Sequence, residues 1–349
     1  MKRYLLTLTP LSDFFFGGEH TFGADEERKE GSRYRAVSRR FPSQSAVVGA
    51  LRRAILIEAG CMSLHKRGEW VDRRGKKGTP DPNYDEAVRL CGSEPFSYER
   101  GIEMGILKSF SPLLIRQGEH FYIPAPPDMG LQPLEGEGRA LLGDRSLEPA
   151  WSFTGYDPKK GIEHKLLGDD GTKTDYEKFF EKVSTVGIKK SRTGKTEENA
   201  FFIKESWKFK DKAHFAFFLE SSEALPFEKT QIFLGADRSA FLLQAMESDD
   251  DPTIRFAKHI PSNGKSRLVT IGETILTPEA TEHCRFILGE RVRQRTIISN
   301  KNGKFSKSVP FFRYEPGSVL YTDEPEKLTE KLAATGLTKS GINHTITIK

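Results

Sequence analysis

The sequence predicts an α+β fold that contains two ferredoxin-like βαββαβ units with insertions. Two observations lead to this prediction. A strand pattern followed by a helix pattern opens the chain over residues 2–60, and a helix, a loop and a strand close it over residues 325–349. Between them, short segments of alternating hydrophobicity are typical of hairpins. We expect an N-terminal unit at residues 1–182 and a C-terminal unit at residues 183–349.

The first strand is predicted at Lys2–Thr9. Its side chains alternate, with Tyr4, Leu6 and Leu8 on one side and Leu5 and Thr7 on the other. A glycine-punctuated loop carrying aromatic residues is expected next, over residues 10–23.

The first helix is predicted within residues 41–60. Pro42 ends the preceding segment, Ser43 or Ser45 can cap the helix start, and Gly60 stands where a left-handed closing residue belongs. The four-residue spacing of its apolar side chains predicts one buried face, formed by Val47, Val48, Leu51, Ala54 and Ile55.

Several residues of this helix are candidates for RNA contact. Its N-terminus, with Ser43, Gln44 and Ser45, resembles an anion site. Gly49 interrupts the helix at a cost of about 1 kcal/mol relative to alanine, which suggests that another group approaches the backbone there. Arg52 follows at the edge of the apolar face. The alternative is an ordinary amphipathic helix with a good cap.

The later elements follow from local patterns. We expect a hairpin at residues 106–123, with strands at 106–110 and 119–123, and a local hairpin or arm around Trp151 and Phe153. Residues 66–83 are interpreted as a loop or a partly disordered insertion, and the remainder of 128–182 carries no clear pattern. Further on we expect strands at 183–188, 200–204, 232–235, 267–275 and 344–349, a strand pair at 207–220, and a strand with a Pro-Gly-Ser turn at 310–321. Helices are expected at 240–246, 278–288 and 325–334.

Positive charge is concentrated in one part of the chain. The 349 residues carry a formal net charge of +5 and are 30% charged. Residues 33–77 contain 12 Lys or Arg and 3 Asp or Glu, so the rest of the chain is net negative. Such a segment suits phosphate binding, although a solvated basic loop has the same composition.

Two loops and one aromatic side chain complete the predicted RNA contacts. Basic residues after the strand at 183–188 can neutralise phosphates, and glycines in the C-terminal loop let backbone N–H groups approach RNA. Phe22 can stack on an unpaired base, or equally lie in the core beneath its loop. The loop residues are Lys189, Lys190, Arg192 and Lys195 in the first loop, and Gly336, Lys339, Ser340, Gly341 and Asn343 in the second.

Several apparent motifs do not support catalysis. The fragments at residues 194–196 and 264–266 imitate a phosphate-binding loop, but Lys189 and His259 stand where it requires glycine. The acidic pair in Gly168–Asp170 lies in a predicted polar loop. His20 and His344 lie in or beside the glycine-containing loops and are interpreted as hydrogen-bonding loop residues, with general-base catalysis as the alternative.

The three cysteines form no short-spaced pair, which argues against a disulfide framework or a zinc site. The N-terminal apolar stretch is interrupted too early for a signal peptide, and no run approaches the roughly 18 apolar residues of a membrane span. We therefore expect a cytoplasmic protein with no metal and no cofactor.

The order of these motifs resembles the RAMP superfamily of CRISPR proteins, and within it the subunit family that caps the guide RNA of type III-B (Cmr) effector complexes. The resemblance rests on Asp13–Gly17, Phe22–Gly23, Phe41–Pro42 and Val48–Arg52, followed by the strand, basic loop and strand of residues 183–204. It also implies RRM-like units of the predicted ferredoxin-like type.

The resemblance implies a non-catalytic RNA-binding subunit that holds the 5′ tag of the crRNA and caps the backbone filament. Its implied partners are the crRNA, the large polymerase/nuclease-like subunit and the backbone subunits, without a membrane. Two alternatives remain open: a RAMP endoribonuclease that processes the guide precursor, and the equivalent subunit of another type III complex.

Overall fold

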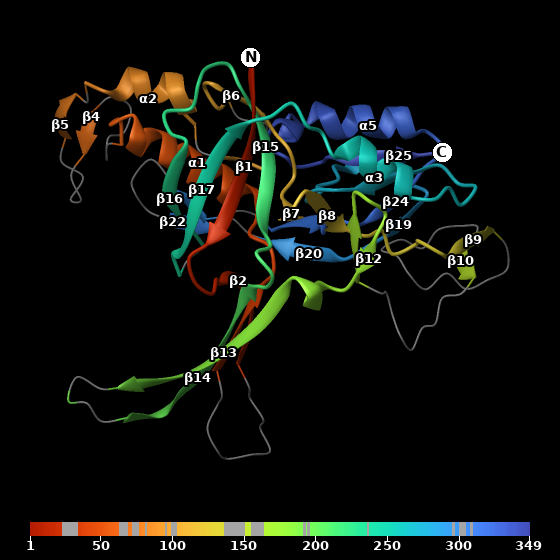
Figure 1. The fold of residues 1–349 in the computed structure, drawn as a ribbon, viewed down its shortest axis with the longest axis horizontal. Helices are drawn as coiled ribbons and strands as arrows, with labels where there is room; N and C mark the ends of the chain where they lie inside the picture. The colour runs from red at the N-terminus through yellow and green to blue at the C-terminus, as the bar shows by residue number, and fades with distance from the viewer. Residues whose placement is uncertain are drawn as a thin grey trace.

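The computed structural model describes most of the chain. The described residues are 1–22, 34–62, 69–71, 77–80, 82–94, 96–98, 103–135, 151–154, 164–190, 193, 196–235, 237–294, 297–299, 305–307 and 310–349. They form a mixed α and β structure, in which a large sheet lies at the centre (Figure 1).

The central element is β1 (Lys2–Pro10), which confirms the predicted first strand. It pairs antiparallel with a strand on each side in a nine-stranded sheet. The order is β12 (Lys173–Thr174), β11 (Leu166–Gly168), β8 (His120–Pro124), β7 (Leu114–Gln117), β15 (His214–Ser221), β1, β17 (Ser239–Glu247) and β16 (Lys229–Leu234), and β6 (Leu107–Phe110) also pairs with β15.

Both faces of β1 are buried, each in a different core. Tyr4, Leu6 and Leu8 enter a core shared with the first helix, whereas Leu5 enters a core shared with the C-terminal part of the chain. Because β15, β16 and β17 follow residue 182, the two units that we expected on either side of that residue share one sheet.

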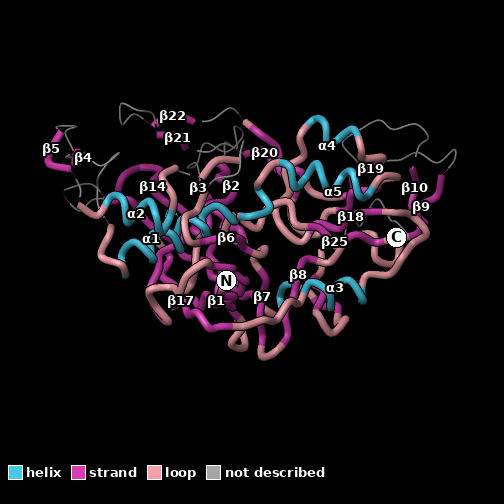
Figure 2. Tube along the Cα trace, turned by 90° about the horizontal axis from the view of Figure 1, so that it is seen from above, coloured by secondary structure: helices cyan, strands magenta, loops and turns pink. Residues whose placement is uncertain are grey.

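The helix α1 (Gln44–Glu58) packs on the first face of the sheet, and all five predicted apolar residues are buried. Gly60 has φ +67°, as a left-handed closing residue requires. Ser43 occupies the N-cap position, but its hydroxyl makes no capping hydrogen bond. Figure 2 shows α1 and α2 (Tyr84–Cys91) together at one end of the molecule.

A second sheet contains a long hairpin that extends away from the body (Figure 1). Its order is β13 (Phe180–Lys190), β14 (Thr196–Phe209), β3 (Tyr34–Arg39) and β2 (Phe16–Phe22). The predicted aromatic loop at residues 10–23 is thus partly a strand, because β2 finds its hydrogen-bonding partner in β3.

The C-terminal sheet covers the second face of the central sheet. Its order is β19 (Phe286–Leu288), β24 (Val319–Tyr321), β18 (Arg267–Thr270) and β25 (Thr345–Ile348). α4 (Pro278–Glu282) and α5 (Pro325–Ala334) lie on its outer side, and α3 (Thr253–His259) contributes to the core between the two sheets. That core joins Leu5 and Phe218 of the central sheet to Val269, Tyr321 and Ile346 of the C-terminal sheet.

The remaining elements are short. They are the strand pairs β4 (Glu69–Val71) with β5 (Lys77–Pro80), β9 (Gln132–Glu135) with β10 (Trp151–Thr154), β20 (Arg291–Gln294) with β23 (Phe311–Tyr314) and β21 (Ile297–Ser299) with β22 (Phe305–Lys307), and the 3₁₀ turns η1 (Tyr176–Lys178) and η2 (Leu337–Lys339). Among the described residues, no helix is long and apolar enough to cross a bilayer.

Four more of the sequence predictions above need correction. Residues 240–246 form β17 rather than a helix, because pairing with β1 and β16 satisfies their backbone. Residues 278–288 are helical only to Glu282, and residues 286–288 form β19. Residues 106–123 hold three strands, of which β7 and β8 form the hairpin while β6 pairs with β15. Residues 66–83 include the paired strands β4 and β5.

Candidate nucleic-acid interface

The N-terminus of α1 meets the C-terminal loop, although they are far apart in the sequence. The Gln44 side chain is buried, and its Nε2 donates a hydrogen bond to the carbonyl of Ser111 at 3.1 Å. Gly341, with φ +81°, lies against the same two groups, and a Cβ on it would lie 2.5 Å from the Ser111 carbonyl oxygen. The structure therefore brings together two predicted site residues, Gln44 and Gly341.

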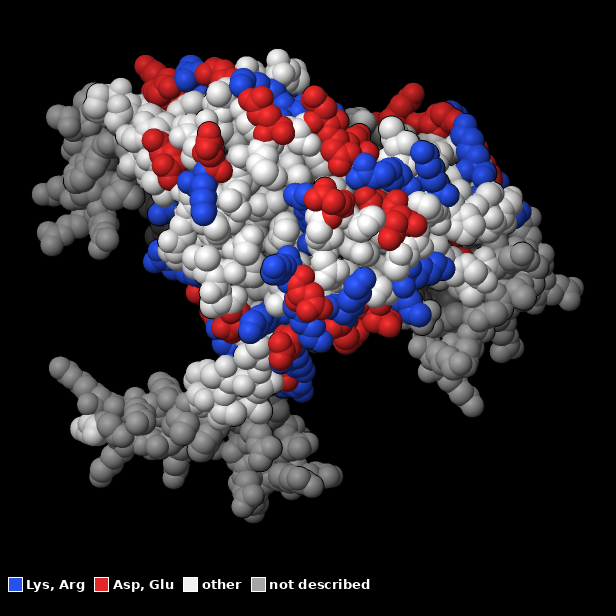
Figure 3. Space-filling model, viewed as in Figure 1, with Lys and Arg blue, Asp and Glu red and all other residues white. Residues whose placement is uncertain are grey.

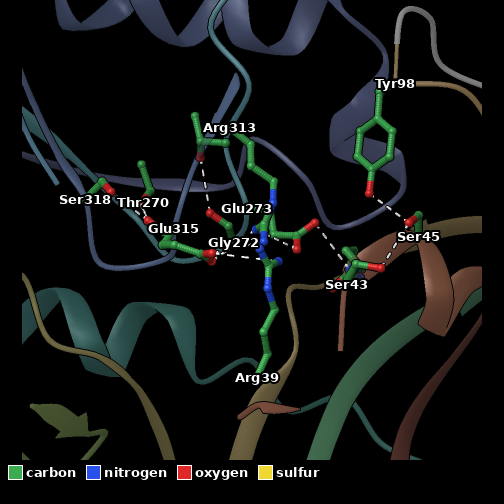
Figure 4. Close-up of polar contacts among 12 residues, drawn as sticks. Arg39, Ser43, Ser45, Tyr98, Thr270, Gly272, Glu273, Arg313, Glu315 and Ser318 are labelled. Carbon is green, nitrogen blue, oxygen red and sulfur yellow. Dashed lines mark hydrogen bonds and ion pairs between the residues drawn. The ribbon is translucent and has the colours of Figure 1, made fainter. Parts of the chain in front are cut away.

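A carboxylate of the chain itself occupies the start of α1. The backbone N–H of Gln44 donates to Oε2 of Glu273 at 3.3 Å, and Arg313 holds Oε1 of the same carboxylate at 2.8 Å. Burial raises the pKa of Glu273, and Arg313 opposes that rise. Figure 4 shows Arg313 and Glu273 next to Ser43, which directly precedes the helix. The anion site that the sequence predicts at this helix is thus filled from within.

The hydroxyl groups of Ser43 and Ser45 face each other rather than the helix backbone. Their oxygens lie 3.2 Å apart, and the Tyr98 hydroxyl donates to Ser45 at 2.7 Å. The ring of Tyr98 packs against Phe96 and Phe311, with centroids 4.9 and 4.8 Å away. Because both serines are half-buried, they remain partly accessible to a ligand.

Most residues of the predicted C-terminal loop serve the fold. Asn343 has φ +62°, accepts a hydrogen bond from the Ile275 N–H at 2.8 Å and donates to Leu332 and Thr335. Ser340 is buried against Met104. By contrast, Gly336 is half-buried and Lys339 is exposed, so these two residues are open to a partner.

Two other residues of α1 differ in their accessibility. Gly49 is exposed, and no atom of the described chain comes within 4 Å of the place where its Cβ would stand. The close approach predicted at Gly49 is therefore not made by the described part of this chain. Arg52 donates to the carbonyls of Gly92 and Glu94 at 3.3 and 2.8 Å, and burial lowers its pKa.

The basic residues of the hairpin loop are only partly described. The backbones of Lys189 and Lys190 form the end of β13, and that of Phe22 ends β2, but their side chains lie outside the described residues. Arg192 and Lys195 lie outside them altogether. The structure therefore places the backbone of the predicted phosphate-binding lysines on the extended hairpin and does not bring it to the α1 N-terminus (Figure 1).

Comparison with known families decides the identity of the chain. The family model described as "CRISPR-associated protein (Cas_Cmr3)" matches residues 6–349. The chain belongs to the Cas_Cmr3 family. This result confirms the resemblance drawn from residues 13–52 and 183–204.

Solved structures support the Cas_Cmr3 fold. A chain of a structure titled "Cryo-EM structure of the Type III-B Cmr-beta bound to cognate target RNA" matches with a TM-score of 0.55 and 12% identity, over 99% of this chain and 96% of that chain. The corresponding structure with AMPPnP gives a TM-score of 0.52 and 11% identity over the same shares. At these identities the likeness shows the fold alone. No curated protein matches the chain.

Sequence reasoning did not single out two residues beside the candidate interface, Arg39 and Arg40. Arg40 lies between two aromatic rings, 4.8 Å from the centroid of Tyr176 and 4.7 Å from that of Trp207. Arg39 reaches towards Glu315 (Figure 4). The Arg-Arg pair directly before Phe41–Pro42, within the basic segment, was the signal that could have found them.

Charge on the described surface is organised in local pairs. On the face shown in Figure 3, Lys and Arg side chains are interspersed with Asp and Glu over the body. The Lys and Arg side chains described on that face therefore form no broad basic patch.

The acidic pair Asp169–Asp170 lies in a tight turn between β11 and β12, not in the polar loop that the sequence suggested. Asp169 accepts hydrogen bonds from Arg255 at 2.9 Å and from the Phe121 N–H, and it lies 3.2 Å from His120. Although His120 and the two aspartates are close enough for a metal, Arg255 already neutralises Asp169. These groups therefore form a structural ion-pair cluster rather than a cation site.

The structure describes the side chain of only one of the two histidines that were considered as general bases. The His344 imidazole Nε2 donates to the Thr338 carbonyl at 2.7 Å, and burial lowers its pKa. This bond matches the interpretation of His344 as a loop hydrogen-bonding residue. The His20 side chain lies outside the described residues.

Proposed function

We propose that this chain is a non-catalytic RNA-binding subunit of a type III-B CRISPR (Cmr) RNA-guided effector complex, holding the 5′ tag of the crRNA and capping the backbone filament. The observation that carries the proposal is the family match over residues 6–349. The structural likeness to a chain of a Cmr-beta complex bound to target RNA supports it. Its partners would be the crRNA, the large polymerase/nuclease-like subunit and the backbone subunits, acting in the cytoplasm.

We also propose that the fold derives from two ferredoxin-like units. In the C-terminal sheet, the chain runs through β18, α4, β19, β24, α5 and β25, with strand order β25-β18-β24-β19. This sequence of elements is the βαββαβ pattern. The N-terminal unit would centre on β1, α1, β16 and β17, with the hairpin β13–β14 and β15 inserted before β16. The unit boundary would then lie after β17, near residue 250, rather than at residue 182.

The accessible part of the predicted site supplies the RNA contacts in this proposal. Lys189, Lys190, Arg192 and Lys195 would hold phosphates, and Phe22, Ser43, Ser45, Gly336 and Lys339 would contact bases or backbone. Gly49 and the exposed side of α1 would be available to a neighbouring subunit. Gln44, Ser340, Gly341 and Asn343 would support the site through their internal contacts.

The test is RNA retention by the reconstituted complex. Charge reversal of both Lys189 and Lys190 to Glu should weaken binding of RNA regardless of its sequence. Each lost contact should flatten the log–log salt dependence by about 0.7, the value for single strands. Lys258→Glu, at an exposed position of α3, is the control and should leave the slope unchanged.

The competing functions give different results in the same assay. Specific cleavage of repeat RNA that survives a chelator and disappears in His20→Ala or His344→Ala would favour the endoribonuclease. A loss of rate of about 10²–10⁴-fold is expected when a general base is removed. Assembly with the subunits of a different type III complex, and not with Cmr subunits, would favour the equivalent subunit of that complex.

A further inference from the structure

Three donor groups, from the end of β3 to the start of α1, each face an acidic side chain of the same chain. The Arg39 guanidinium lies 3.9 Å from Glu315, and the Arg40 guanidinium lies 3.6 Å from Glu177. The third donor, the backbone N–H of Gln44, bonds to Glu273 at 3.3 Å. A stretch of six residues thus presents a row of donors, and each donor is matched by a carboxylate.

The innermost of these donor–carboxylate pairs, Gln44 with Glu273, has a structural role. The Glu273 side chain is 8% exposed and is shared with Arg313, whose own side chain is 1% exposed. Removing that carboxylate would leave a buried guanidinium with one partner fewer, which is costly. We therefore regard Glu273 as a permanent part of the fold.

The two outer pairs, Arg39 with Glu315 and Arg40 with Glu177, are weaker contacts. Arg313 already bonds both carboxylate oxygens of Glu315, at 2.9 and 3.0 Å, so Arg39 is a secondary neighbour of this group. The Glu177 side chain is 73% exposed. Separations of 3.9 and 3.6 Å are longer than hydrogen bonds, so within the described residues these arginines have charged neighbours but no hydrogen-bonded anion.

The two arginines are nevertheless held in position. Tyr176 and Trp207 enclose the Arg40 guanidinium, and the Trp207 indole N–H is fixed by the Ser38 carbonyl at 2.9 Å. The Arg40 Nε is buried without a hydrogen-bond partner. Arg39 ends β3 and points towards the C-terminal part of the chain (Figure 4). Stacking of this kind keeps a planar guanidinium ready for a bidentate anion.

We propose that RNA phosphates replace Glu315 and Glu177 as the partners of Arg39 and Arg40, which together clamp the RNA backbone where the β13–β14 hairpin meets the C-terminal part of the chain. A phosphodiester offers the same single charge and paired oxygens as a carboxylate, at hydrogen-bonding distance. The choice of RNA as the ligand rests on the proposed function.

The structure offers a matched control pair for this clamp. Arg116 also lies 3.6 Å from an exposed glutamate, Glu119, and its guanidinium also lies over an aromatic ring, that of Phe121. It belongs to β7, on the central sheet. Any general effect of losing a stacked, ion-paired arginine should appear in both pairs, whereas an effect on RNA should appear only at Arg39 and Arg40.

The experiment measures binding of a 5′-tagged guide RNA to the reconstituted complex at several salt concentrations. Arg39→Gln and Arg40→Gln should each weaken binding about fourfold at 0.15 M salt and flatten the salt slope by about 0.7, and Arg116→Gln should change neither. Glu177→Gln removes a competing anion and should tighten binding about two- to threefold, while Glu119→Gln should not. This gain cannot result from misfolding.

Two results would contradict the clamp. If the complex retains guide RNA while both arginine variants keep the wild-type affinity and slope, the clamp is wrong and the proposed function stands. A weaker affinity in Glu177→Gln would also overturn it, because the glutamate would then assist binding. If the wild-type complex retains no guide RNA, the proposed function and the clamp fail together.

Discussion

At the scale of single residues, Gly341 shows why the C-terminal loop tolerates little change. Its φ of +81° is a conformation that side chains with a Cβ rarely adopt, and the Ser111 carbonyl and the Gln44 amide fill the space that a Cβ would need. The glycine therefore sets how closely the loop approaches the start of α1.

Replacement by alanine separates these two effects. Gly341→Ala should destabilise the chain by about 1–2 kcal/mol for the backbone conformation and by about 1–3 kcal/mol more for the overpacking. Gly264→Ala is the matched control, because Gly264 has φ +79° and no atom within 4 Å of a Cβ. Urea unfolding of both variants measures the difference. Equal losses of unfolding free energy in the two variants would mean that the Gln44 side chain moves aside without an energetic penalty.

His344 should make stability sensitive to acid. Burial holds its folded pKa below the ordinary value of 6.5, so the unfolded chain binds the proton more readily. The contribution of this residue is therefore present above about pH 6.5 and is lost as the pH falls below it. His344→Gln keeps an N–H donor and should lose less stability than wild type between about pH 7 and pH 5. His164→Gln, at an exposed position, should follow wild type.

The fate of individual site residues could be predicted only in part. Ser43, Gln44 and Ser45 were correctly placed at the helix start, because capping signals are local. The carboxylate that fills this site comes from Glu273, more than 200 residues away in the sequence, so no local pattern could predict this contact. Asn343 likewise lies in a segment whose composition is typical of a binding loop. Its hydrogen bonds to Ile275 and Leu332 depend on the tertiary fold and could not be predicted from the local sequence.

At the scale of elements, the helices α1 and α5 were predicted closely, because each has an apolar face with four-residue spacing and a proline near its start. The strand β17 was predicted as a helix because its segment is short and rich in apolar residues. Only its two neighbours in the sheet decide its conformation, and β1 lies more than 200 residues earlier.

The exposed face of α1 gives a test of assembly. Gly49 has open space around it in the described chain, so Gly49→Ala and Gly49→Val should both fold, with unchanged or slightly higher stability. If a neighbouring subunit or RNA approaches the backbone there, the valine variant should assemble less well than the alanine variant. Thermal unfolding of the isolated chain and pull-down of the complex measure the two properties. If Gly49→Val assembles as well as wild type, no partner approaches the backbone closely at Gly49.

At the scale of the whole molecule, β1 joins the two main cores. Its neighbouring residues Leu5 and Leu6 point to opposite faces of the sheet, Leu5 into the core with the C-terminal sheet and Leu6 into the core with α1. Loss of packing on either face must therefore strain the same strand.

Leu5→Ala and Leu6→Ala test this coupling. Each substitution should cost about 2–5 kcal/mol, and both should lower the midpoint of one common unfolding transition. Circular dichroism and tryptophan fluorescence should report the same midpoint in each variant. Two separate transitions, of which Leu5→Ala affects only one, would show that the cores unfold independently. Ile57→Ala, at an exposed position on α1, serves as the control.

The position of β1 also has a consequence for synthesis on the ribosome. Its hydrogen-bonding neighbours β15 and β17 begin at residues 214 and 239, so β1 emerges long before either of them. At about 5–20 residues per second, the interval to β15 is about 10–40 s. During this time an apolar strand with two unpaired edges is exposed to other nascent chains. We expect a chaperone, or an early partner in assembly, to protect the N-terminal strand until the ribosome has delivered its neighbours.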